Sequence, residues 1–121
     1  MVTDSKTKSL LCLKAALEKK ALDPVLLELK GITSFTDYFL LCSGKSDRQV
    51  QAIAQGIEEN LKKDGIRPLG QEGITRGRWV LMDYGDVVVH IFLETVRTFY
   101  DLEGLWIDAP RIDFQKGGSI G

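Results

Sequence analysis

Histidine and cysteine are scarce in this chain, and long apolar runs are absent. One histidine, His90, and two cysteines, Cys12 and Cys42, lie too far apart in the sequence to resemble a structural zinc site. The cysteines sit among apolar residues without a C-x-x-C motif, which predicts buried thiols in a reducing compartment. Apolar runs such as residues 39–42 are far shorter than the ~18 residues of a membrane-spanning helix. We therefore expect a soluble, cytoplasmic protein that holds no metal.

The charges nearly cancel. The 121 residues carry 16 Lys and Arg against 17 Asp and Glu, a net charge of -1. That balance argues against wrapping nucleic acid with the whole surface, because such binding needs many Lys and Arg contacts to phosphates. The length is that of one domain, and we expect residues 1–121 to form it, with flexible ends at 1–5 and 115–121.

The acidic residues are concentrated toward the carboxyl end of the chain. Residues 83–113 carry seven acidic side chains against two basic ones, a net charge of -5, whereas the remainder carries +4. Aromatic residues accompany the acids, including Tyr84, Phe99, Tyr100 and Trp106, with Trp79 just before them. Aromatics beside carboxylates suit the binding of a basic protein, but core aromatics beside solvated acids would give the same composition.

Hydrophobic periodicity predicts an α/β (α+β) fold. The expected elements are a helix through 9–17, strands at 25–29 and 37–42, a helix from 46 to 63, strands at 66–69, 79–84 and 87–93, and a helix at 94–100. Residues 70–77 are expected to be a polar loop. This order has too few crossovers for a doubly wound parallel sheet, so we predict a five-stranded mixed sheet flanked by helices.

Asp83 and Asp86 are the first candidates for chemistry. Two carboxylates beside a turn could hold Mg²⁺ or share acid and base roles, but metal-dependent nucleotidyl transfer needs carboxylates two positions apart on one strand. At three positions apart, aspartates at a hairpin more often cap their own backbone. We favour that interpretation.

Other motifs are weaker. Ser43, Gly44 and Ser46 could cradle a phosphate at a helix start, although strand-to-helix turns use the same residues simply to reverse direction. His90 lies mid-strand on one face with Val88 and Phe92, where a structural histidine is commoner than a catalytic base. Neither cysteine resembles an activated thiolate.

Four segments closely resemble the ribosomal silencing factor family, also called the RsfS or Iojap family. They are residues 36–39, 42–49, 77–92 and 97–106, and the tract from Trp79 through D-Y-G-D-V-V-V-H is the most specific. The similarity extends over roughly residues 10–112. It implies a fold like that of nucleotidyltransferases but without their catalytic carboxylates.

The resemblance implies a non-enzymatic repressor of translation without a cofactor. Family members bind the large ribosomal subunit through ribosomal protein number fourteen and block its association with the small subunit when nutrients are scarce. Free members are often homodimers. The partner-facing surface carried over by position comprises Trp79, Asp83, Tyr84, Asp86, His90, Tyr100, Asp101 and Glu103.

Two other functions stay open at this stage. A nucleotide-binding or phosphoryl-transfer enzyme would use Ser43, Asp83 and Asp86. Direct RNA binding would use Lys45, Arg48, Lys62, Lys63 and Arg67. We favour the interpretation that these residues form a solvated helix face, and we expect no primary nucleic-acid contact. Gly104 replaces a larger residue of many relatives and is expected to loosen the last helical turn.

Overall fold

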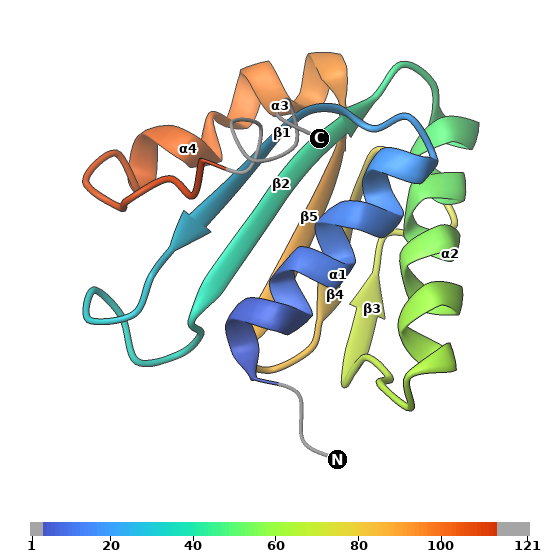
Figure 1. Cartoon of the computed structure of the whole chain (residues 1–121). Helices are drawn as coiled ribbons and strands as arrows, with labels where there is room; N and C mark the ends of the chain where they lie inside the picture. The colour runs from blue at the N-terminus through green and yellow to red at the C-terminus, as the bar shows by residue number, and fades with distance from the viewer. Residues whose placement is uncertain (1–3, 114–121) are drawn as a thin grey trace.

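Two apolar strands form the centre of the sheet in the computed structural model, which describes residues 4–113 (Figure 1). They are β2 (Tyr38–Gly44) and β5 (Val87–Leu93), which pair in parallel and are buried on both faces apart from Leu93. The other strands are β1 (Leu22–Glu28), β3 (Gly70–Glu72) and β4 (Trp79–Asp83). Their pairings are antiparallel, in the order β1-β2-β5-β4-β3, which confirms the predicted five-stranded mixed sheet.

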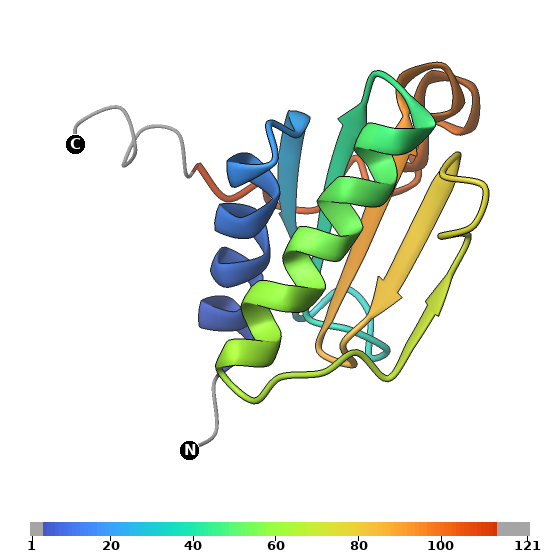
Figure 2. The ribbon, with the colours of Figure 1, turned by 90° about the vertical axis from the view of Figure 1, so that its right-hand side faces the viewer.

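Helices cover the two faces of the sheet unequally. The two long helices, α1 (Ser5–Glu18) and α2 (Asp47–Lys63), lie side by side over one face (Figure 2). The short helices α3 (Glu94–Tyr100) and α4 (Leu102–Leu105) lie on the other face. The apolar stripe of α2 is buried against the sheet, and Ser46 caps the helix, because its Oγ accepts a hydrogen bond from the Gln49 N–H at 3.1 Å.

The chain ends lie mostly outside the described residues. Of the segments expected to be flexible, only Asp4 and Ser5 are described. The Asp4 carboxylate caps α1 by accepting a hydrogen bond from the Thr7 N–H at 2.7 Å, and Ser5 is the first helical residue. At the other end, residues 110–112 hydrogen-bond to β1 along its outer edge.

The third strand is not where the sequence pattern placed it. It spans Gly70–Glu72, inside the expected polar loop, and the prediction of a strand at residues 66–69 is wrong. Ile66 instead closes the turn that follows α2. Its N–H donates to the Leu61 carbonyl at 3.0 Å, and its side chain packs on the core. Pro68 has no N–H for a sheet ladder, which delays pairing with β4 until Leu69 and Gly70.

The first strand is longer than expected. It begins at Leu22 rather than at the predicted residue 25, and it includes Asp23 and Pro24. A register shift between Leu22 and Val25 absorbs the proline, and Asp23 adopts a φ of 46° there. Because β1 has only one strand neighbour, a bulge with proline is tolerated at this position.

Candidate functional site

The candidate site lies on the sheet face opposite α1 and α2. Along β4, Val80 and Met82 are buried beneath those helices, whereas Trp79, Leu81 and Asp83 point the other way and are half-buried. The partial exposure of these three side chains distinguishes β4 from the fully covered strand β5 beside it. We call the surface formed by Trp79, Leu81 and Asp83 the open face.

A hydrogen bond fixes Trp79 on this face. The Trp79 indole N–H donates to His90 Nδ1 at 3.1 Å, so His90 must carry its own proton on Nε2. His90 is only 5% exposed, and burial lowers its pKa to about 4, which keeps the imidazole neutral and able to accept. Its Nε2 has no hydrogen-bond partner among the described residues. His90 is therefore a buried group that orients Trp79.

Aromatic rings extend the site toward α3. The Trp79 ring lies 4.9 Å from that of Phe92 and 5.0 Å from that of Tyr100, measured between centroids. Tyr100 is 53% exposed and Phe99, next to it, is 80% exposed. A shallow cavity of about 470 Å³ separates the start of β4 from α3, and its lining comprises Arg78, Trp79, Thr95, Val96, Phe99 and Tyr100. Together they form what we call the aromatic cavity.

The predicted acidic residues next to the aromatic cavity differ in their surroundings. Asp101 is exposed at the junction of α3 and α4, with a left-handed φ of 45°. Glu103 instead accepts a hydrogen bond from Arg97 Nε at 2.9 Å and lies 3.7 Å from Arg111. A Cβ at Gly104 would lie 2.5 Å from a carboxylate oxygen of Asp101, an exposed side chain that can rotate away from it.

Arg97 secures this helical segment to the sheet. Besides its contact with Glu103, it donates to the Asp23 carbonyl at 2.7 Å and to Ser43 Oγ at 2.9 Å. Leu105 and Ile107 follow on the surface and are 75% and 72% exposed. The segment thus presents apolar side chains and carboxylates together, held by one half-buried guanidinium.

Two residues of the predicted surface lie elsewhere. Tyr84 is buried in the core beneath α1 and α2, and this burial raises the pKa of its phenol. Asp86 pairs with Lys8 of α1 at 2.8 Å. The structure thus brings Trp79, His90 and Tyr100 together, with Asp101 and Glu103 on the adjoining helices. Tyr84 faces away from them, and Asp83 and Asp86 lie near the hairpin at the far end of β4.

The groups that suggested phosphoryl transfer have structural partners. Asp83 accepts a hydrogen bond from the Gly85 N–H at 2.8 Å, as expected of a turn-capping aspartate. The buried hydroxyl of Ser43 is bound by Arg97. A Cβ at Gly44 would meet the Val50 backbone nitrogen at 3.0 Å, so packing against α2 accounts for that glycine. Within residues 4–113, no three His, Cys, Asp or Glu side chains are placed to share a metal ion.

The cysteines are buried free thiols, as the sequence predicted. Cys12 lies in α1 and Cys42 in β2, and burial raises the pKa of each to about 12. A thiol with that pKa is protonated at neutral pH and is a poor nucleophile. Among the described helices, none is both long and apolar enough to span a membrane.

Sequence analysis missed part of the site. Arg78, Thr95 and Val96 were not selected, and Phe99 was noted only as one aromatic of the acidic segment. No sequence motif marks Arg78 or Thr95, because only the fold brings them to the same cavity. For Phe99, adjacency to Tyr100 at the end of a short helix was the available signal.

Comparison with known proteins gives one consistent family. The family model described as "Ribosomal silencing factor during starvation" matches residues 2–120. A ribosomal silencing factor of Bacillus subtilis is 47% identical over 112 residues, covering 91% of this chain and 95% of that protein. A mouse protein named for mitochondrial assembly of the ribosomal large subunit is 29% identical over 92 residues, which cover 74% of this chain and 40% of that protein. A crystal structure of a Chromobacterium violaceum protein superposes with a TM-score of 0.84 at 38% identity, covering 86% and 87% of the two chains.

Proposed function

Because this chain belongs to the ribosomal silencing factor family, we propose that it represses translation by occupying the large ribosomal subunit. Its bacterial relatives carry the silencing name, and the mouse relative is named for assembly of the large subunit. The finer proposal is that the chain binds ribosomal protein number fourteen. Docking there blocks the small subunit from joining when nutrients are scarce.

The observation that carries this proposal is the arrangement around Trp79. A large aromatic side chain that is half-buried, oriented by His90 and flanked by Tyr100 has the character of a binding hot spot. Its orientation is set before binding, so little side-chain entropy is lost on docking. The exposed rings and apolar groups of α3 and α4 add contact area around it.

Charge supports a basic protein as the target. The -5 net charge of residues 83–113 includes Asp101 and Glu103, which follow the cavity residue Tyr100 in the chain. Carboxylates at the rim of an interface accelerate encounter with a basic partner and fix its orientation, while central aromatics determine how slowly it leaves. We propose Trp79, Tyr100, Asp101 and Glu103 as the docking set, with buried His90 orienting Trp79 and with Asp83 extending the surface toward the hairpin. Tyr84 and Asp86 support it from the core and from the hairpin.

We further propose that the protein acts without catalysis or a cofactor, and that the free protein is a cytoplasmic homodimer. The carboxylates and hydroxyl on which an enzymatic reading depends are occupied by Gly85, Lys8 and Arg97. Exposed Phe99, Leu105 and Ile107 give the free protein an apolar surface of the kind that associates with a second copy.

Binding to isolated ribosomal protein number fourteen tests the proposal. Trp79→Ala is expected to weaken binding by about 2 kcal/mol or more, on the order of 30-fold, mainly through faster dissociation. Leu17→Ala is the matched control, because Leu17 is a partly exposed side chain of α1 on the opposite side of the sheet. If a folded Trp79→Ala variant bound as tightly as the control, Trp79 would not be the anchor.

A further inference from the structure

A second cavity lies beside the aromatic one and has the opposite character. It has a volume of about 700 Å³ and opens between the start of α2 and the loop that leads into β4. Three cationic side chains line it, from Lys45, Arg76 and Arg78, against one carboxylate, that of Asp47. Arg78 lines both cavities, so the two are neighbours on the surface. We call Lys45, Arg76 and Arg78 the basic pocket.

The basic pocket has an excess of two positive charges, because three cations face the single carboxylate of Asp47. All three residues are exposed, and none takes part in an ion pair with another residue in the range 4–113. Lys8, Arg97 and Arg111, by contrast, lie within ion-pair distance of Asp86 or Glu103. Three like charges around one hollow repel each other and attract an anion into it.

The loop that carries two of these cations is fixed to α2. The Gln51 side-chain amide donates to the carbonyls of Ile74 and Thr75 at 2.9 and 3.0 Å. Gly77 has a φ of 68°, and a Cβ there would lie 2.6 Å from the Asp47 carbonyl oxygen, so the loop approaches the helix too closely for a side chain. The backbone on both sides of Gly77 is therefore set before any ligand arrives.

The adjoining start of α2 does not form a nucleotide cradle. Side-chain oxygens already accept from its backbone donors, namely Gln49 Oε1 from the Lys45 N–H, Asp47 Oδ1 from the Arg48 N–H, and Ser46 Oγ from the Gln49 N–H. Mononucleotide sites depend on free N–H groups around the phosphates. A wide hollow whose charged side chains are three cations and one carboxylate suits the phosphates of a polynucleotide backbone instead.

We propose that the basic pocket binds backbone phosphates of ribosomal RNA next to the protein target. This inference rests on the proposed function, since it assigns the pocket to the same ribosomal surface. The aromatic cavity contacts a basic protein, while Lys45, Arg76 and Arg78 contact adjacent RNA. The RNA contact is secondary to the protein contact. Its three cations belong to the part of the chain outside residues 83–113, which carries a net charge of +4.

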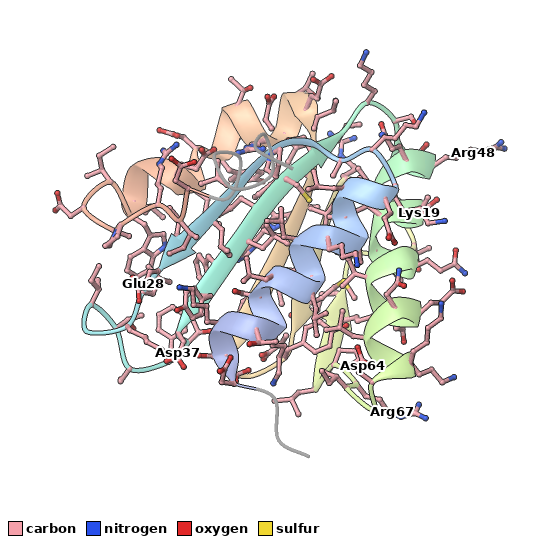
Figure 3. All side chains as sticks on the ribbon, in the orientation of Figure 1. Lys19, Glu28, Asp37, Arg48, Asp64 and Arg67 are labelled. Carbon is pink, nitrogen blue, oxygen red and sulfur yellow. The ribbon has the colours of Figure 1, made fainter. Side chains whose placement is uncertain are left out.

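The structure separates this pocket from the other basic residues considered earlier. Figure 3 shows Arg67 at the opposite end of α2 from Arg48, which extends into solvent. Lys62 and Arg67 line a different hollow, together with Glu58 and Glu59. Those carboxylates offset the two cations. Lys62 and its neighbour Lys63 lie in the last turn of α2. They provide a control pair with the same total charge as Lys45 and Arg76.

Two double variants test the pocket. Lys45→Gln with Arg76→Gln removes two cations without altering the aromatic cavity, and Lys62→Gln with Lys63→Gln removes two cations at the other end of α2. Binding of each to naked large-subunit RNA is measured across salt concentrations. The pocket variant is expected to lose affinity and to reduce the slope of log K against log salt by roughly 1.4 to 1.8, whereas the control variant keeps the wild-type slope.

Three results would contradict the proposal that the basic pocket binds RNA phosphates. Equal losses in both double variants would mean that net charge alone drives RNA binding, and an unchanged pocket variant would mean that the pocket makes no phosphate contact. Displacement of the RNA by a free nucleoside triphosphate, lost in the pocket variant, would assign the site to a mononucleotide. Binding to ribosomal protein number fourteen is followed in parallel, so that failure of the proposed function is seen separately.

Discussion

Acidification from pH 7 to pH 5 is expected to lower the free energy of unfolding by about 2 kcal/mol through His90 alone. Burial holds the pKa of His90 at about 4 in the folded protein, against 6.5 for an exposed histidine. Between these values the unfolded chain binds a proton that the folded protein does not, so acid favours unfolding. The loss begins near pH 6.5, grows as the pH falls, and is complete at about pH 4.

Protonation of buried His90 would also break its contact with Trp79. Protonated His90 would carry hydrogens on both ring nitrogens, so Nδ1 could no longer accept from the Trp79 indole. Two buried donors would then face each other. The loss of the indole hydrogen bond is therefore expected to accompany titration of the imidazole.

His90→Asn isolates the effect. The asparagine side chain does not titrate, and its carbonyl oxygen can accept from the Trp79 indole near the position of Nδ1. Urea unfolding of both proteins at pH 7 and pH 5 gives the measurement. The wild type is expected to lose about 2 kcal/mol more than the variant over this interval. Equal losses in the two proteins would show that burial does not hold the pKa of His90 below its usual value, and the predicted pH dependence would fail.

Three further predictions concern stability and reactivity. Arg97→Ala removes the hydrogen bonds that tie α3 and α4 to the sheet, and is expected to lower the free energy of unfolding by about 2 to 3 kcal/mol in chemical denaturation. Arg97→Lys is expected to recover part of this loss, and a loss under about 0.5 kcal/mol for Arg97→Ala would contradict the prediction. Gly77→Ala forces a side chain against the Asp47 carbonyl at a positive φ and is expected to cost about 2 kcal/mol in the same assay, so an unchanged midpoint would contradict the close approach. Cys12 and Cys42 are expected to react with a thiol reagent only at the rate of unfolding, and fast labelling of the native protein would mean that they are accessible.

The sequence predicted the central elements well because their signals are local. The apolar runs of β2 and β5 have no exposed face, so their burial was visible without knowledge of their partners. The order of all five strands in the chain and the helix at 94–100 were also correct. β3 was misplaced because a three-residue edge strand, paired only with β4, carries almost no hydrophobic pattern.

The composition of the site depends on tertiary register. Parity along a strand shows that Tyr84 lies one residue out of phase with Trp79 and Asp83, and hence faces the other side of the sheet. The hairpin at Gly85 pairs Leu81 with His90, which brings Trp79 within reach of the imidazole. No local pattern could place the α3–α4 segment, since its position depends on Arg97 reaching Ser43, 54 residues away in the chain.

Subunit joining tests the central claim most directly. Purified large and small ribosomal subunits are mixed with increasing amounts of the protein, and joined particles are separated from free subunits on a density gradient. The wild type is expected to abolish joining in a saturable manner, while Trp79→Ala requires on the order of 30-fold more protein for the same effect. Joining that continues unchanged at saturating wild-type protein would contradict the silencing function.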